Sequence, residues 1–157
     1  MAKPARARES PGTFFVTSSA WERRQIFRSE RMATLFIEVV DHYRQEGQYL
    51  LHDFVLMPDH FHLLITLRRA LTIERAIQLV KGGFSFRAGR ELEFKGEIWQ
   101  RGFTDHIVKD VRDFDSHRNY IRENPVKRGL AARSDEYRFS SVFPGIELDA
   151  ASEHLRR

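Results

Sequence analysis

The strongest constraint on the fold is a pair of apolar-rich runs, Tyr49 to Met57 and His60 to Leu67, separated only by Pro58-Asp59. Proline restricts its own backbone to the angles of a tight turn, and aspartate bonds readily to nearby backbone amides. Two extended runs joined by such a dipeptide predict an antiparallel β-hairpin. One face of its second strand is uniformly apolar, so other elements of the chain must cover it.

A strand and a helix are expected before the hairpin. Residues 13–18 are rich in β-branched and aromatic side chains and follow Pro11-Gly12, which predicts a strand. Ser29 is placed to cap a helix whose apolar residues recur at three-and-four spacing, and Gly47 is placed to end it. This helix has the clearest periodicity in the chain.

After the hairpin, the pattern predicts a helix, a strand and a second helix. The first is expected from about Thr72 and is weakened or bent at Gly82-Gly83. Residues 98–108 predict a strand. The last helix is expected from about Asp110 to Glu123 and to stop at Asn124-Pro125, because the residue before proline avoids the helical conformation.

The order strand, helix, two strands, helix, strand, helix predicts an α+β fold, a ferredoxin-like sandwich. In that fold an antiparallel sheet carries helices on one face, and we expect the other face to be free for a ligand. With 157 residues, 41% of them hydrophobic, the chain can build one core. We expect a basic flexible arm at 1–11, the domain at 12–130 and a C-terminal tail at 131–157 with a frayed end.

Composition excludes several classes of protein. The chain has no cysteine, so disulfides, thiolate metal sites and cysteine nucleophiles are excluded. No apolar run approaches the roughly 18 residues that span a bilayer, and the first dozen residues lack the apolar core of a signal peptide. We therefore expect a soluble, unexported protein with no membrane partner. The net charge of +4 is compatible with nucleic acid, an anionic membrane surface or simple solubility.

Two histidines share one face of the strand after the hairpin turn. Strand side chains alternate, so His60 and His62 point away from the apolar face that carries Phe61 and Leu63. Two adjacent imidazoles on one face can serve as two ligands of one cation. The alternative is that both are solvated polar residues on an outer face.

A tyrosine and an asparagine lie close together on the last expected helix. Tyr120 borders the buried stripe of Val111, Phe114 and Ile121, and Asn124 projects about 40° away from it around the axis. With a pKa of about 10, roughly one free tyrosine in a thousand is ionised at neutral pH. If Tyr120 attacks a phosphodiester, a cation bound to that phosphate would assist the attack. The alternatives are that Tyr120 is a packing residue whose hydroxyl lies in solvent and that Asn124 terminates the helix.

Several motifs in fixed order make the sequence resemble a known family. They are MPDHFHLLI (57–65), KGGFSFR (81–87), IWQRGFTDHIV (98–108), NYIRENPVKRGL (119–130) and YRFSS (137–141). Together they resemble the single-tyrosine HUH transposases, and most closely the REP-associated tyrosine transposases of bacteria. The resemblance runs from about residue 12 to residue 141. In YRFSS, Arg138-Phe139 stand where proline and tryptophan are usual in the family.

The resemblance implies a fold, an activity and a metal. The fold is the HUH endonuclease fold, with the active site on the sheet face opposite the helices. His60, His62 and Asn124 would bind a divalent metal, Mg²⁺ or Mn²⁺, and Tyr120 would attack single-stranded DNA. The product would be a 5′-phosphotyrosyl enzyme with a free 3′-hydroxyl, which can reverse to join strands. The substrate would be a REP sequence, an extragenic palindrome that folds as a hairpin, handled in the bacterial cytoplasm at the nucleoid.

Basic residues near these motifs are candidate DNA contacts, each of which would release counterions on binding a phosphate. They are Arg87, Arg90, Arg101, Arg118, Arg122, Lys127 and Arg128. Taken singly, each is equally explained by solvation. His106 lies within a family motif, where a structural role is favoured over a part in the metal site, and His117 is one turn before Tyr120 and could tune it.

Three functions remain open from the sequence. The first is a metal-dependent DNA strand transferase that acts in transposition. The second is a REP-hairpin-binding protein without catalysis, and the third is a metal-dependent phosphoesterase that uses water. Both a monomer and a homodimer are compatible with the sequence.

Overall fold

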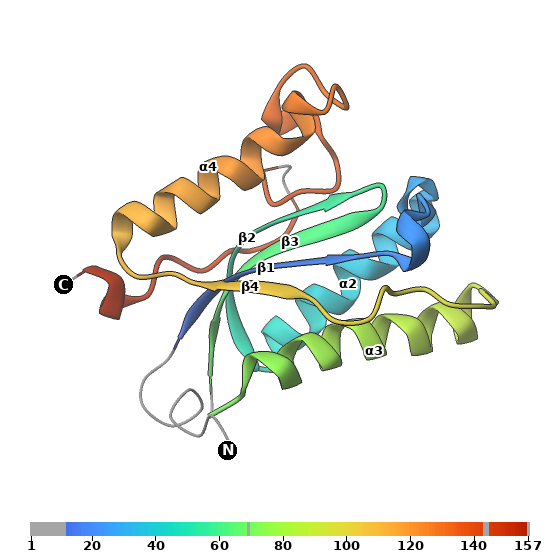
Figure 1. The fold of residues 1–157 in the computed structure, drawn as a ribbon, viewed down its shortest axis with the longest axis horizontal. Helices are drawn as coiled ribbons and strands as arrows, with labels where there is room; N and C mark the ends of the chain where they lie inside the picture. Colours follow the sequence, from blue (N-terminus) through green and yellow to red (C-terminus); the bar gives the residue numbers. More distant parts are fainter. Residues whose placement is uncertain (1–11, 69, 143–144, 157) are drawn as a thin grey trace.

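A four-stranded antiparallel sheet and three long helices make up the computed structural model, which describes residues 12–68, 70–142 and 145–156 (Figure 1). The strands are β1 (Thr13–Ser19), β2 (Tyr49–Met57), β3 (His60–Leu67) and β4 (Thr104–Ile107), in the sheet order β2-β3-β1-β4. The helices are α2 (Glu30–Gln45), α3 (Ile73–Glu91) and α4 (Val111–Lys127). Short 3₁₀ turns are η1 (Trp21–Arg23), η2 (Ile26–Arg28), η3 (Ser134–Glu136) and η4 (Glu153–Arg156). This confirms the expected element order and fold class.

The central hairpin forms as the sequence predicts. β2 and β3 pair antiparallel around the Pro58-Asp59 turn, with Met57 opposite His60. A bulge between Leu51 and Asp53 shifts the register of β2. Such a bulge re-aims the side chains that follow it, which here include Asp53.

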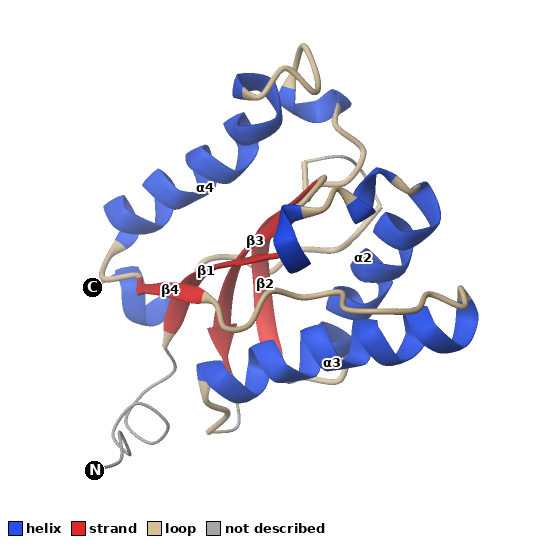
Figure 2. Cartoon of the chain, turned by 45° about the vertical axis from the view of Figure 1, so that its right-hand side comes forward, coloured by secondary structure: helices blue, strands red, loops and turns tan. Residues whose placement is uncertain are grey.

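Two helices cover one face of the sheet, as expected, and the third helix lies over part of the other face. α2 and α3 lie on one face (Figure 2), and side chains such as Phe36 and Phe84 pack there with Phe61 in the larger core. α4 lies over part of the opposite face, and its Phe114 and Ile121 are buried in a second, smaller core. Val111, expected in that stripe, is 40% exposed. The sequence shows that α4 is amphipathic but not which surface it covers.

Local capping chemistry explains where α2 and α3 begin. The Ser29 hydroxyl accepts the Met32 amide at the start of α2, and the Thr72 hydroxyl accepts the Arg75 amide at the start of α3. α3 continues through Gly83 instead of weakening there. A Cβ at Gly83 would lie 2.8 Å from the Tyr43 hydroxyl, so this glycine permits the close approach of α2 and α3.

Two expected boundaries are wrong. Within residues 98–108 only Thr104–Ile107 form a strand, because the earlier part makes only an isolated bridge, between Trp99 and Ala20, just beyond the end of β1. The last helix does not stop at Asn124 but includes Pro125 and ends at Lys127. A proline in the last turn removes few helical hydrogen bonds, and the amide of Leu130 still donates to the Pro125 carbonyl at 2.8 Å.

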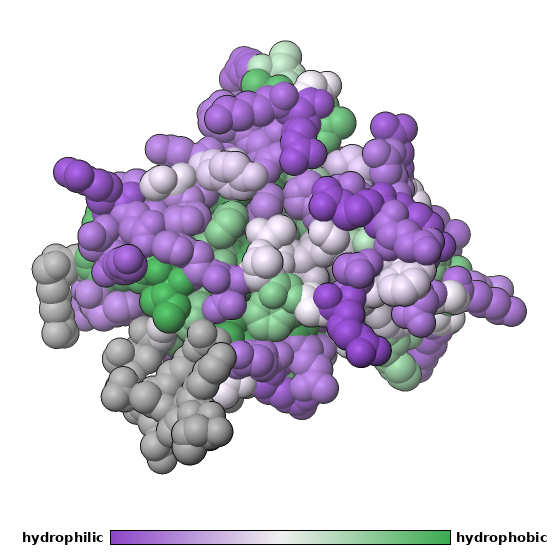
Figure 3. All heavy atoms as spheres, in the orientation of Figure 1, coloured by the Kyte–Doolittle hydropathy of each residue, from purple (hydrophilic) through white to green (hydrophobic). Residues whose placement is uncertain are grey.

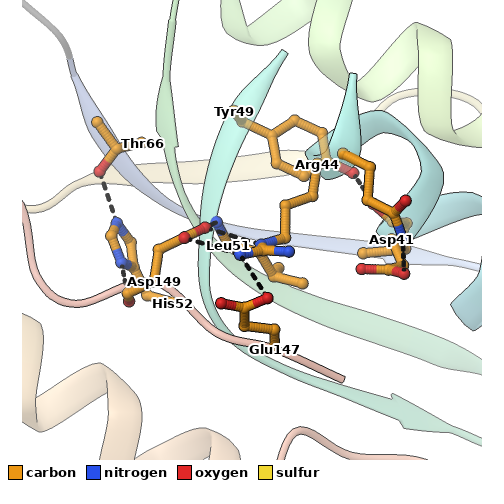
Figure 4. A network of polar contacts seen from close by, with 10 residues as sticks. Asp41, Arg44, Tyr49, Leu51, His52, Thr66, Glu147 and Asp149 are labelled. Carbon is orange, nitrogen blue, oxygen red and sulfur yellow. Dashed lines mark hydrogen bonds and ion pairs between the residues drawn. The ribbon is translucent and has the colours of Figure 1, made fainter. Parts of the chain in front are cut away.

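The C-terminal segment is packed, contrary to the expected frayed end. Asp149 accepts two hydrogen bonds of 3.0 Å from the Arg44 guanidinium and one of 2.8 Å from the Leu51 amide (Figure 4). Further along, Leu155 is buried against the second core. The basic arm expected at 1–11 lies outside the described residues. Among the helices that are described, none has the length and apolar character of a membrane span.

Candidate functional site

His60 and His62 lie side by side at the start of β3, on the face that α4 covers. Their rings are 4.9 Å apart, and each residue is 4% exposed, so the alternative of two solvated outer residues is wrong. His60 Nδ1 lies 2.7 Å from an Asp59 carboxylate oxygen, and His62 Nδ1 lies 2.7 Å from the Thr17 hydroxyl. With both Nδ1 atoms occupied, each imidazole presents Nε2, which is the arrangement of metal-binding histidines oriented by outer partners.

Burial keeps this histidine pair neutral. Burial lowers the pKa of His62 to about 3, and it lowers the pKa of His60 despite the opposing effect of Asp59. A neutral imidazole has the lone pair that a metal ion requires. The pair is therefore in the ligand form at physiological pH without the help of a cation.

α4 brings Tyr120 and Asn124 to the histidines. Asn124 is buried, and its side-chain amide nitrogen lies 3.2 Å from His62 Nε2. The Tyr120 ring meets the His62 ring edge-on at 5.3 Å but is 46% exposed. Because Asn124 is inside α4, its alternative role as helix terminator is wrong. The four predicted residues thus meet at one place, with the phenol facing outward.

A buried carboxylate that sequence reasoning missed joins α4 to the sheet. Asp53 follows the β2 bulge, has no exposed side-chain surface, and accepts a hydrogen bond of 2.9 Å from Arg122 Nε. Arg118 Nε lies 3.5 Å away from the same oxygen. Burial raises the pKa of the Asp53 carboxyl, and the two guanidinium groups oppose that shift. The one signal in the sequence was a charged residue inside an apolar run.

Arg118 and Arg122 were expected to contact DNA, but their guanidinium Nε atoms face Asp53 instead. They flank Tyr120 at two residues on either side, so their ion pairs hold the part of α4 that carries the phenol. This contact with β2 gives both arginines a structural role, and their part in DNA binding stays a prediction.

The remaining basic candidates fall into two groups. Arg87 and Arg90 lie on α3, across the sheet from α4; Arg87 is bonded to Glu38 and Glu91, which raise its pKa. Lys127 and Arg128 are exposed at the end of α4, near Asn124. Arg128 is close enough to the histidine pair to contribute to its lowered pKa values.

Arg101 belongs with the second of these groups. The Gln100 amide donates to the Ser19 carbonyl, and Ser19 pairs with His60 in the sheet, so exposed Arg101 lies at the hairpin-turn end. Lys81 was not predicted from the sequence as a site residue. It holds the same segment in place by donating to the Gln100 and Gly102 carbonyls at 3.0 and 2.8 Å. Figure 3 shows that the surface over α4 is largely hydrophilic.

Comparison with known proteins adds a family and a solved neighbour. The sequence pattern described as IS200-like transposase matches residues 15–124. A REP-associated tyrosine transposase of Escherichia coli is 24% identical over 131 residues, covering 83% of this chain and 76% of that protein. A Haemophilus influenzae protein, provisionally given the same name, is 25% identical over 155 residues, covering 90% and 86%. A solved REP-associated tyrosine transposase bound to a REP hairpin aligns with a TM-score of 0.67 at 25% identity, over 90% of this chain and 86% of that one.

Proposed function

This chain belongs to the family of IS200-like transposases, which makes it a DNA-cleaving, strand-transferring enzyme, and from that premise we propose that Tyr120 is its nucleophile on REP-type hairpin DNA. The observation that carries the proposal is the position of Tyr120. Its ring is half exposed while it contacts His62, a buried and neutral imidazole. A DNA backbone on the α4 surface can therefore reach the phenol, which lies against the buried His62 ring.

The proposed chemistry is a reversible transfer of a phosphodiester. The Tyr120 phenolate oxygen attacks phosphorus, a phosphotyrosine bond forms to the 5′-phosphate of the downstream strand, and the bond from phosphorus to the 3′ oxygen of the upstream strand breaks. The leaving oxygen takes a proton and becomes a free 3′-hydroxyl. Attack of a 3′-hydroxyl on the phosphotyrosine reverses the step and joins strands.

His60, His62 and Asn124 are the residues proposed to hold Mg²⁺ or Mn²⁺. The donor set fits such an ion, because both Nε2 atoms carry lone pairs and the Asn124 amide already lies against one of them. A half-turn of that amide places its oxygen where its nitrogen now lies. The ion, when bound, would neutralise charge on the scissile phosphate and orient it.

Hairpin DNA is the proposed substrate, since the solved relative is bound to a REP hairpin. On this chain we propose Arg101, Lys127 and Arg128 as its phosphate contacts, because these residues are exposed around the hairpin-turn end of the site. Tyr120, Asn124 and the histidines meet within one chain, which supports a site that is complete in a monomer.

A covalent-adduct assay tests the proposal. A hairpin oligonucleotide labelled at its 3′ end is incubated with protein and Mn²⁺, and the adduct is separated under denaturing conditions. We expect the 3′ label to be retained on protein and a 5′ label to be released with a 3′-hydroxyl. Tyr120→Phe should form no adduct, and Tyr43→Phe, which changes a phenol between α2 and α3, should behave as wild type.

The same assay distinguishes the two other functions. Cleavage that persists in Tyr120→Phe without an adduct would select a phosphoesterase that uses water. Hairpin binding without cleavage under Mg²⁺ or Mn²⁺ would select a DNA-binding protein. Either result overturns the assignment of Tyr120 as nucleophile.

A further inference from the structure

A second cluster of metal-ligating side chains lies outside the histidine pair, where β4 leads into α4. His106 comes from β4, and Asp113 and His117 lie one turn apart near the start of α4. Their ligand atoms all lie within 4.8 Å of one another. The short connection between β4 and α4 brings these residues together, although eleven positions separate the first from the last.

The Asp113 carboxylate lies between the two imidazoles. His106 Nε2 is 2.9 Å from one of its oxygens, and His117 Nδ1 is 3.2 Å from the other. The rings lie 4.7 Å apart. His106 shares a proton with the carboxylate, and His117 Nδ1 bonds the Asp113 backbone carbonyl at 2.9 Å, so an ion that replaces these two protons would have three ligands after small ring rotations.

Other contacts hold this carboxylate in position. The backbone amide of Lys109 donates to the Asp113 carboxylate at 3.0 Å, and the Asp110 side chain accepts the Asp113 amide at 2.8 Å. Outer-shell hydrogen bonds of this kind orient metal ligands. His106 is 43% exposed, so water or a phosphate oxygen can reach the remaining coordination positions.

The cluster is distinct from the site at His60 and His62. In the sheet, His106 pairs with Phe15, and Thr17, the next residue on that face of β1, pairs with His62. The Phe15 ring lies between the two sites, 4.6 Å from the His117 ring and 5.2 Å from the His62 ring. An aromatic ring separates the two donor sets, so one ion cannot be shared between them.

We propose that His106, Asp113 and His117 form a second metal site, which takes a first-row transition-metal ion such as Zn²⁺ or Co²⁺. Two imidazoles and one carboxylate are a ligand set that suits these ions. The alternative is that these hydrogen bonds only stabilise the β4–α4 connection and bind no metal.

Cobalt binding by untagged, metal-stripped protein tests this site. Visible absorption and equilibrium dialysis with Co²⁺ should count two ions on the wild type and one on His106→Gln. The same loss is expected for His117→Gln. His42→Ala, which changes an exposed histidine on α2, is the matched control and should keep both ions.

A double variant distinguishes the two sites from each other. His60→Gln with His62→Gln should also bind one ion, and its cobalt spectrum should match the one that His106→Gln loses. Circular dichroism checks that each variant is folded; if the double variant unfolds, the comparison of wild type with His106→Gln decides alone. Equal cobalt stoichiometry and affinity in those two proteins would overturn the second site.

Discussion

Asp53 and Arg122 join β2 to α4 through a 2.9 Å ion pair whose carboxylate is completely buried. Asp53→Asn removes the charge that compensates Arg122 and Arg118. Breaking a buried pair costs about 3 to 5 kcal/mol, and we expect about 3 kcal/mol here because both arginines are partly exposed. Urea unfolding measures the loss. Asp135→Asn, which breaks an exposed pair with Arg133, is the control and should change stability by less than about 1 kcal/mol.

The hydrogen bond that His62 Nδ1 donates to the Thr17 hydroxyl should affect metal binding more than folding. Thr17→Val keeps the shape of the side chain but leaves the imidazole without its outer partner. Such a loss lowers metal affinity about 10- to 100-fold. Calorimetric titration with Mn²⁺ measures it. Thr104→Val, on the neighbouring strand and exposed, should bind as wild type, and equal affinities in all three proteins would contradict the orienting role.

The exposed end of α4 should dominate phosphate contacts. Lys127→Ala and Arg128→Ala are each expected to weaken hairpin binding and to reduce the slope of log affinity against log salt by about one. Arg87→Ala should leave the slope unchanged, because Arg87 is bonded to Glu38 and Glu91 across the sheet. Fluorescence anisotropy at several salt concentrations gives the slopes. If Arg87→Ala also reduced the slope of log affinity against log salt, α3 would have to be part of the DNA-binding surface.

The packed C-terminal segment should contribute to stability through Asp149. Asp149→Ala removes the partner of Arg44 and of the Leu51 amide, and we expect a loss of about 2 kcal/mol. Glu147→Ala removes an 83% exposed carboxylate that lies 4.0 Å from the same arginine, and it should cost little. Equal unfolding midpoints for the two variants would show that this segment adds nothing.

Buried His52 should make stability depend on pH. Its nitrogens contact the Asp149 carbonyl at 2.9 Å and the Thr66 hydroxyl at 2.7 Å, and burial lowers its pKa from 6.5. The unfolded chain therefore binds more protons as the pH falls below 6.5, and stability is lost toward the lower, folded pKa. The change in unfolding free energy between pH 7 and pH 5 should be smaller in His52→Gln than in wild type. The other buried histidines are common to both proteins, so an unchanged difference would exclude His52 as a source.

Local chemistry explains which parts of the fold the sequence could predict. Ser29 and Thr72 cap their own helices, and Pro58-Asp59 forms its own turn, so each signal lies beside the structure it determines. Reliance on a local rule also explains the wrong end predicted for the last helix. That rule places a helix end before Pro125, whereas the packing of the buried α4 residues Ile121 and Asn124 keeps that turn helical.

The candidate site was only partly predictable from sequence. Alternation along β3 correctly placed His60 and His62 on one side, but it could not show that α4 would bury them. Asp53 gained its partners through a bulge and a helix 65 or more positions away, which no spacing rule encodes. The contact of Arg118 and Arg122 with Asp53 could therefore not be predicted from the sequence.

The length of the turn at Pro58-Asp59 should matter for more than folding. Asp59 contacts Arg23 outside and His60 inside, so a single residue links the molecular surface to a buried imidazole. Most surface turns tolerate insertions during evolution. An extra residue between Asp59 and His60 would leave β3 paired as before while separating Asp59 from the ring it orients. Relatives that keep the paired histidines should therefore vary in length at other loops and preserve the length of this one.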